Sequence, residues 1–160
     1  MGWQDTAQIC LNGHLINSYY QDSPHNNQKY CDKCGEKTIT ECPDCGEAIK
    51  GKYHYDNIAT FSEYEVPSYC HNCGSPYPWT TKKIMAAKEY VDFMEELSSE
   101  EKEALKNNID DIITDSPRTK LASQKVKYYL TKVGKGLATG FKDILIDFAS
   151  ETAKKIIMEA

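Results

Sequence analysis

The pattern of apolar and polar residues divides the chain into two parts, and the second part has helical spacing. From Lys82 to Leu97, apolar residues recur every three or four positions, which predicts an amphipathic helix. A second helix is predicted to start at Ser98, because Ser98 and Glu101 have the spacing of a capping box. Its buried side is expected to consist of Ala104, Leu105, Ile109, Ile112 and Ile113.

A third helix is predicted after the polar stop at residues 115–117. Ser116 can cap its N-terminus and Pro117 suits its first turn. The apolar residues of this helix run from Leu121 to Val133, and the glycines at 134 and 136 then weaken the helical pattern. This spacing indicates that the third helix ends close to Val133.

The apolar stripe resumes at Leu137 and continues to Ile156, which predicts a fourth helix reaching almost to the C-terminus. Phe141 and Phe148 lie seven residues apart on this stripe. Either the stripe packs within the helical module or it is an association surface, and we expect the latter. Residues 80–160 are therefore predicted to form an all-α module of about four helices.

The first part of the chain, residues 1–79, lacks this periodicity and holds all seven cysteines. Six of them form three pairs with two intervening residues, and a glycine follows each pair. Two thiolates at this spacing can bind one metal ion, and glycine accepts the positive φ of the tight turn. Cys10 remains, and His14, four residues later, can complete a fourth pair. The three cysteine pairs are Cys31/Cys34, Cys42/Cys45 and Cys70/Cys73.

Eight such ligands are enough for two tetrahedral zinc sites, so we predict two zinc ions per chain. Four protein ligands leave no open position for water, which indicates structural sites. Iron–sulfur clusters and disulfides are weaker alternatives, and the odd cysteine count opposes a set of disulfides. Sequential pairing would give site 1 with Cys10, His14, Cys31 and Cys34, and site 2 with Cys42, Cys45, Cys70 and Cys73.

The pairs could instead alternate between the two ions in a cross-braced arrangement. A repeated half-site favours sequential pairing, since Tyr30–Gly35 and Tyr69–Gly74 share the pattern Tyr-Cys-x-x-Cys-Gly. The predicted fold is therefore α+β, with small β-rich tandem zinc ribbons in residues 1–79 followed by the helical module.

Charge narrows the choice of partners. The chain has a formal net charge of −5, which argues against a generally nucleic-acid-binding surface. Residues 117–142 nevertheless hold seven basic and no acidic side chains. We therefore expect this basic stretch to bind a protein partner, a nucleic acid or an anionic membrane surface.

The ligand pattern resembles an uncharacterised bacterial family of zinc-ribbon proteins, a domain of unknown function. The resemblance covers mainly residues 1–80 and rests on all eight ligands and on the segment Cys73-Gly74-x-Pro76-Tyr77-Pro78-Trp79-Thr80. It implies a bacterial, intracellular, zinc-binding protein and implies no activity.

The favoured hypothesis is a non-enzymatic adaptor or assembly protein, with zinc ribbons for recognition and C-terminal helices for oligomerisation or for binding a protein partner. The alternatives are a nucleic-acid-associated regulator and an accessory protein with a membrane-active amphipathic tail. We expect no catalytic residues, because no nucleophile–base pair, open metal site or cofactor loop is visible. No apolar run approaches the roughly 18 residues of a membrane span and no secretory signal opens the chain, so a cytoplasmic location is expected.

Overall fold

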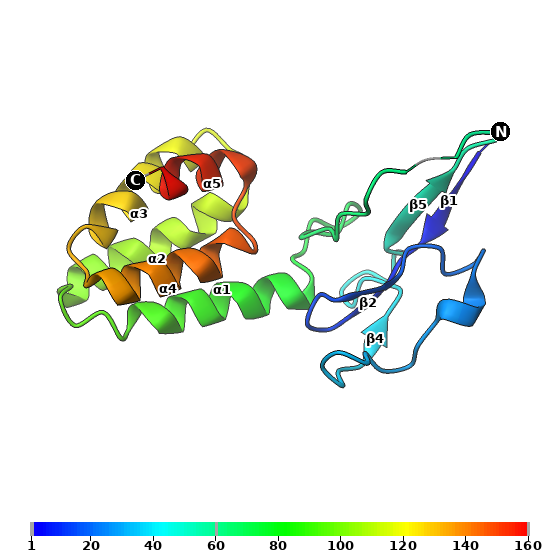
Figure 1. Cartoon of the computed structure of the whole chain (residues 1–160), viewed down its shortest axis with the longest axis horizontal. Coiled ribbons are helices and arrows are strands. Elements are labelled where there is room, and N and C mark those ends of the chain that lie inside the picture. The colour runs from blue at the N-terminus through cyan, green and yellow to red at the C-terminus, as the bar shows by residue number, and fades with distance from the viewer. Residues whose placement is uncertain (1, 60, 160) are drawn as a thin grey trace. The chain divides into compact units, whose positions relative to one another are not determined.

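The computed structural model describes residues 2–59 and 61–159, which form two compact units, Met1–Thr81 and Lys82–Ala160 (Figure 1). The first unit contains short strands and the second contains helices, so the α+β class is confirmed. The strands are β1 (Trp3–Thr6), β2 (Gln8–Cys10), β3 (Leu15–Asn17), β4 (Thr38–Ile39) and β5 (Lys50–His54), with a 3-10 turn at Pro24–Asn26. The helices are α1 (Pro78–Val91), α2 (Ser99–Ile113), α3 (Thr119–Leu130), α4 (Lys135–Ile146) and α5 (Glu151–Met158).

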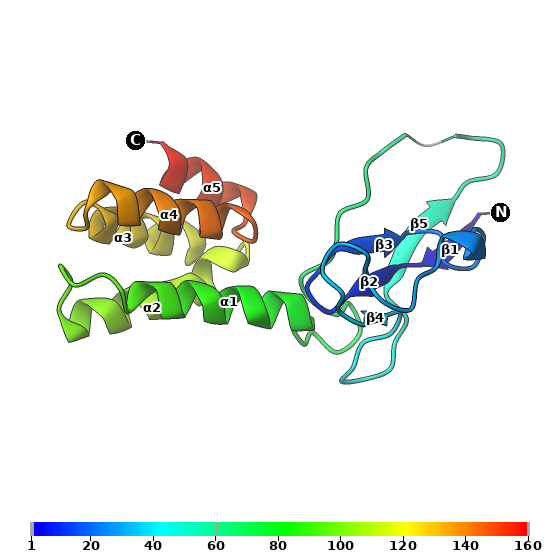
Figure 2. The same ribbon diagram turned by 60° about the horizontal axis from the view of Figure 1, so that its bottom comes forward.

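The strands of the first unit form two small antiparallel sheets (Figure 2). One sheet pairs β1 with β5, in a register that places Trp3 opposite His54. The other has the order β3-β2-β4. Because β1 pairs with a strand more than forty residues away, the two halves of the cysteine-rich segment fold as one unit. Tandem zinc ribbons were expected, and the pairing of β1 with β5 is a long-range contact that the cysteine spacing did not predict.

A small core of buried residues supports this unit. Tyr77 and Trp79 stack with ring centroids 4.7 Å apart, and the Trp79 indole N–H donates a hydrogen bond to the Pro67 carbonyl at 2.8 Å. Aromatic pairs of this kind bury a large apolar area, while the indole N–H keeps a hydrogen-bond acceptor. The buried members of this core are Ala7, Ile9, Cys42, Ile49, Cys70, Tyr77 and Trp79.

The helical unit begins its second helix as the sequence predicts. The Ser98 hydroxyl accepts a hydrogen bond from the Glu101 amide, and the Glu101 carboxylate accepts one from the Ser98 amide. The predicted apolar side of α2 is buried at Leu105, Ile109, Ile112 and Ile113. Helix α3 packs against both α2 and α5, so the core of this unit lies among the helices.

The predicted start of the third helix, at Pro117, is wrong by two residues. Helix α3 begins at Thr119, and the Ser116 hydroxyl accepts a hydrogen bond from the Arg118 amide at 3.2 Å in the turn before it. The Thr119 hydroxyl, which is buried, donates a hydrogen bond to the Thr114 carbonyl at 2.6 Å and accepts one from the Ser116 amide at 2.8 Å. These two bonds hold residues 114–119 in a turn, so the helix starts only after them.

The predicted fourth helix is in fact two helices, which gives five α-helices among residues 2–59 and 61–159. Helix α4 ends at Ile146 and α5 begins at Glu151. The Ser150 amide donates a hydrogen bond to the Ile112 carbonyl of α2, and its hydroxyl accepts one from the Ala153 amide. This contact with α2 interrupts the helix, and Ser150 caps the new one.

The apolar stripe of the last two helices packs inside its own unit. Phe141 and Phe148 are both buried, and Phe141 stacks on Tyr90 of α1 with centroids 5.9 Å apart. Gly140 makes this approach feasible, because a Cβ there would lie 2.3 Å from the Tyr90 hydroxyl oxygen. The two phenylalanines are thus core residues, and the expectation that they form an association surface is wrong.

Within the described ranges, each helix is too short or too polar to traverse a lipid bilayer.

Candidate metal centres

Each predicted ligand pair lies in a tight turn closed by a glycine of positive φ. The four glycines have φ between 75° and 89°, a range that side chains with a Cβ rarely adopt. In the three Cys-x-x-Cys-Gly turns the glycine amide donates to the carbonyl of the first cysteine, as from Gly35 to Cys31 at 2.8 Å. In the Cys10/His14 turn the glycine comes one position before the second ligand, and the Gly13 amide donates to the Cys10 carbonyl at 2.8 Å.

The three cysteine turns also share a second backbone bond. The amide of the first cysteine donates to the carbonyl five residues later, at 2.8 to 2.9 Å in each case. The residues just outside each turn form an isolated antiparallel bridge, as between Tyr30 and Lys37. Local sequence therefore fixes the same turn three times, with both sulfurs on one side of it.

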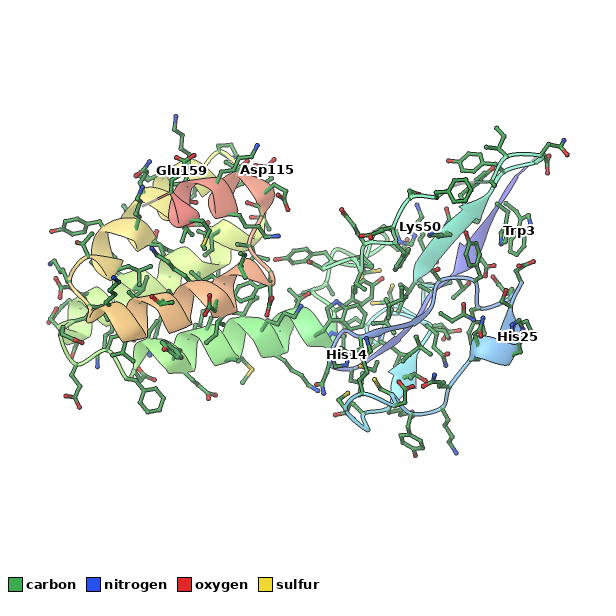
Figure 3. The ribbon with its side chains drawn as sticks, in the orientation of Figure 1. Trp3, His14, His25, Lys50, Asp115 and Glu159 are labelled. Atoms are coloured by element: carbon green, nitrogen blue, oxygen red, sulfur yellow. The ribbon has the colours of Figure 1, made fainter. Side chains whose placement is uncertain are left out.

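The first group brings together the four residues predicted for site 1. The Cys10 and Cys34 sulfurs lie 3.7 Å apart, and the His14 Nδ1 atom lies 3.5 Å from the Cys10 sulfur and 3.6 Å from the Cys31 sulfur. His14 is held at the turn between β2 and β3 (Figure 3). All four ligand atoms lie within 4.8 Å of one another.

The second group brings together the four cysteines predicted for site 2. The Cys42 and Cys73 sulfurs lie 3.8 Å apart, and the Cys45 and Cys70 sulfurs lie 3.7 Å apart. Here too the four ligand atoms lie within 4.8 Å of one another. In both groups a pair from one turn faces the next pair along the chain, which is the sequential arrangement.

These separations fit a tetrahedral zinc ion. With Zn–S bonds of about 2.3 Å and a Zn–N bond of about 2.0–2.1 Å, a regular tetrahedron places two sulfurs about 3.8 Å apart and a sulfur about 3.5–3.6 Å from the nitrogen. The measured distances match both values, at 3.7–3.8 Å and 3.5–3.6 Å. They are also far longer than the roughly 2.05 Å of a disulfide, and all seven cysteines are free.

Hydrogen bonds and burial make the thiols of one group unequal. In site 2, a backbone hydrogen bond from Cys73 lowers the pKa of Cys70 to about 6, whereas burial raises the pKa of Cys42 to about 11. In site 1, the backbone bond from Glu36 lowers the pKa of Cys34 to about 6, and burial raises the pKa of Cys10. A bound cation would override this inequality, because a coordinating thiol is deprotonated outright.

Two asparagines that sequence reasoning missed lie beside these groups. The Asn12 side-chain amide donates to the Cys34 sulfur at 3.4 Å, and that of Asn72 donates to the Cys45 sulfur at 3.6 Å. Both asparagines occupy the second position after the first ligand of a turn. That shared position is the sequence signal that could have identified them.

The other three histidines lie outside the two groups. His54 Nε2 is 2.7 Å from the buried Asp5 carboxylate, and its ring stacks on Trp3 with centroids 4.0 Å apart. His71 lies 3.9 Å from Glu47, and His25 is part of the 3-10 turn. The sequence analysis did not connect Asp5 with His54, which lie 49 residues apart in the chain.

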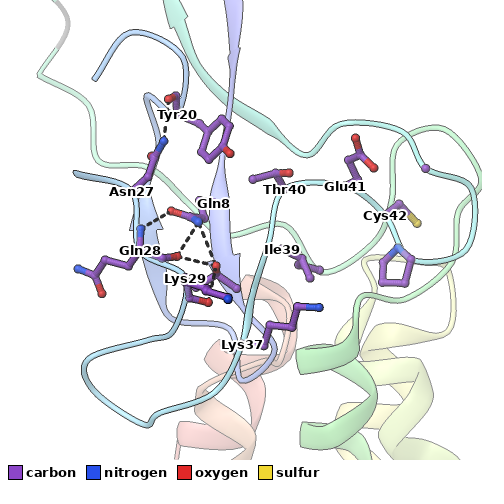
Figure 4. Close-up of a pocket in the computed structure, with 13 residues that line it drawn as sticks. Gln8, Tyr20, Asn27, Gln28, Lys29, Lys37, Ile39, Thr40, Glu41 and Cys42 are labelled. Atoms are coloured by element: carbon purple, nitrogen blue, oxygen red, sulfur yellow. Dashed lines mark hydrogen bonds between the residues drawn. The ribbon is translucent and has the colours of Figure 1, made fainter. Parts of the chain in front are cut away.

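A groove in the first unit lies between the loop at residues 20–29 and the segment from β4 to Pro43, and has a volume of about 720 Å³ (Figure 4). Its polar side chains already bind one another. Gln8 donates to the Gln28 carbonyl at 2.7 Å and accepts from the Gln28 amide at 3.0 Å. The Gln8 side-chain amide is therefore engaged in holding the loop at residues 20–29, and is not available to bind a ligand in the groove.

Comparison with known proteins places this architecture in a bacterial family. No curated protein and no solved structure matches the chain. Residues 3–157 match the family described as an uncharacterized protein conserved in bacteria (DUF2321). This match covers the helical unit as well as the cysteine-rich unit, and so extends beyond the resemblance seen in residues 1–80. With almost its whole length matched, the chain belongs to this bacterial family.

Proposed function

We propose that the chain is a non-enzymatic zinc-binding adaptor, in which two structural zinc ions hold the first unit and the helical unit binds an acidic protein partner. The observation that carries the zinc assignment is the match of the donor distances to a tetrahedral ion in both groups. Each group supplies four protein donors, and a zinc ion so held keeps no position for a water or a substrate.

The small core of the first unit supports a structural role for the metal. Only a few side chains form this core, so the burial of apolar surface contributes little folding free energy. Binding at such sites contributes an apparent free energy on the order of 10 kcal/mol each, which becomes folding free energy. Since Cys42 and Cys70 are themselves core residues, ions bound there would hold the core together directly.

The Asp5–His54 pair is the nearest approach to a catalytic arrangement, and its contacts favour a structural role. Asp5 accepts backbone hydrogen bonds from Thr6 at 2.7 Å, Gln21 at 2.9 Å and Asp22 at 3.3 Å, besides its contact with His54. Through these hydrogen bonds the Asp5 carboxylate connects β1, β5 and the loop at residues 20–22. This supports the proposal that the protein is not an enzyme.

The outward face of α3 is the surface that we assign to a partner. Leu121 and Tyr128 lie seven residues apart on this face and are 50% and 58% exposed. Lysines flank them, with Lys125 on one side and Lys120 and Lys127 on the other. Within residues 2–59 and 61–159, none of these three lysines forms an ion pair, in contrast to Lys88, Lys106 and Lys132 of the same unit. An apolar ridge between unpaired lysines suits an acidic protein surface with an apolar anchor.

The same lysines support nucleic-acid binding as the second candidate, which the acidic first unit opposes. Side chains of residues 1–79 sum to −5, and zinc-bound thiolates would make that unit more negative. Reduced thiolates suit a reducing compartment, so the proposed location is the cytoplasm.

The partner proposal is tested by affinity capture from the bacterial host with the full zinc-loaded chain. The test variant replaces Lys120, Lys125 and Lys127 with Ser, and the control variant replaces Lys135, Lys142 and Lys155. We expect an acidic protein to be captured by wild type and control and lost with the test variant. If wild type instead shifts DNA or RNA in gels at about 0.15 M salt, and only the test variant fails to do so, the nucleic-acid candidate replaces this one.

A further inference from the structure

Three zinc-ligand sulfurs lie on exposed residues, Cys34, Cys45 and Cys73, whereas Cys10, Cys31, Cys42 and Cys70 are buried. An exposed thiolate is the place where an electrophile or oxidant reaches a structural zinc site, because the thiolate is the reactive form of cysteine. Anything that draws electron density from those sulfurs slows that attack. Hydrogen bonds from neighbouring groups are known to tune metal ligands in this way.

We infer that Asn12 and Asn72 cap the exposed thiolates of Cys34 and Cys45 and protect the two sites from thiol-directed reagents. Asn12 lies on the Cys10/His14 turn and donates across the site to Cys34 at 3.4 Å. Asn72 lies on the Cys70/Cys73 turn and donates across the other site to Cys45 at 3.6 Å. The same contact therefore occurs independently in both groups, each time from one turn to the last sulfur of the opposite turn.

The remaining two turns provide an internal contrast. Lys33 and Asp44 occupy the position that Asn12 and Asn72 hold in their own turns. An aspartate side chain has no amide to donate, and none of the described contacts joins the side chain of Lys33 or Asp44 to a ligand sulfur; Asp44 reaches Cys42 with its backbone amide only. Each site thus has one described asparagine side chain that donates to a ligand sulfur, so each donor can be tested by one substitution. This inference rests on the proposed zinc sites.

The test compares Asn12→Asp and Asn72→Asp, which keep the side-chain shape and remove the donor, in the full zinc-loaded chain. Asn26→Asp adds the same charge on the exposed 3-10 turn and is the matched control. Each protein is treated with N-ethylmaleimide. The thiolate sulfur adds to the maleimide double bond, the resulting carbanion takes a proton from water, and the thioether formed is a poor zinc ligand. Mass spectrometry of peptides gives the rate at each cysteine, and a colorimetric chelator follows zinc release.

We expect Asn12→Asp to speed the labelling of Cys34 by about tenfold, the factor that one lost hydrogen bond to a charged group can give. The rate at Cys45 should stay unchanged, so the second site is an internal reference. Asn72→Asp should show the reverse pattern, and Asn26→Asp should show neither. Unchanged rates at the matching cysteine, or equal acceleration in both sites, would overturn the inference.

A spectroscopic readout separates electronic tuning from a loss of stability. In the cobalt-substituted protein, removing the donor should move the thiolate-to-cobalt charge-transfer band of that site to lower energy, and an unmoved band would contradict the inference. Should an aspartate variant lose its zinc during purification, Asn12→Ala and Asn72→Ala decide by the same two criteria. Wild-type protein that holds no zinc would instead refute the proposed function, so the two failures are distinguishable.

Discussion

Asp5 illustrates at the scale of one residue how this chain joins segments distant in sequence. Its side chain is fully buried and lies 2.7 Å from His54 Nε2. Burial opposes ionisation of this carboxyl, but the His54 contact and the backbone hydrogen bonds from Gln21, Thr6 and Asp22 outweigh it and lower the pKa. The charged form is therefore favoured by folding, although the group is out of contact with water.

Asp5→Asn should destabilise the first unit by about 1–3 kcal/mol at neutral pH, since a buried hydrogen-bonded charge is lost. A carboxyl whose pKa is lowered on folding stabilises above its unfolded value of about 3.9, and that contribution disappears as pH falls through the folded value. Urea unfolding followed by tryptophan fluorescence measures the difference, because Trp3 and Trp79 both lie in the first unit. The difference between wild type and variant should hold down to about pH 4 and then shrink. An equal loss with the exposed Asp22→Asn would contradict this account.

At the scale of elements, local sequence predicts features that a few neighbouring residues determine. The four ligand turns depend on a ligand pair and a glycine, and the α2 cap depends on Ser98 and Glu101. Both could therefore be read from the sequence. The pairing of β1 with β5, and the break before Ser150, depend on contacts with distant partners such as Ile112. No local pattern encodes those contacts, and so the β1–β5 pairing was not predicted and the single fourth helix was predicted wrongly.

Ser98→Ala removes the hydroxyl half of the capping box of α2, and should lower the free energy of unfolding of the helical unit by about 1 kcal/mol. Ser99→Ala is the matched control, because Ser99 is exposed and is the first residue inside the helix. Far-UV circular dichroism during urea unfolding measures both variants. A Ser99→Ala effect as large as that of Ser98→Ala would show that the cap contributes nothing specific.

At the scale of the whole molecule, the two units should respond separately to loss of metal. Every ligand of both proposed sites lies in the first unit, and the helices α2 to α5 lie in the second. Within the first unit the two sites are unequal, because Cys42 and Cys70 pack in the described cluster with Tyr77 and Trp79, whereas the buried Cys10 and Cys31 of site 1 are not members of that cluster. The sequence indicates both sets of ligands but gives no sign of this inequality, which arises from packing.

Cys31→Ser and Cys70→Ser should each leave about one zinc ion per chain, and both should keep most of the helical circular dichroism signal. The urea concentration at the midpoint of the tryptophan-monitored transition should fall in both variants. It should fall further for Cys70→Ser, because that variant loses the zinc ion held by residues of the core cluster. A helical signal that collapses together with the tryptophan transition would contradict the independence of the two units. An equal shift in the two variants would contradict the role of site 2 in the core.

The most direct measurement is the zinc content of the full chain purified without added metal, determined by elemental analysis alongside native mass spectrometry. The distances among eight ligand atoms in two groups predict two zinc ions per chain. A strong chelator should remove both ions, and the first unit should then unfold. A ratio near one, or iron with visible colour in place of zinc, would contradict this account.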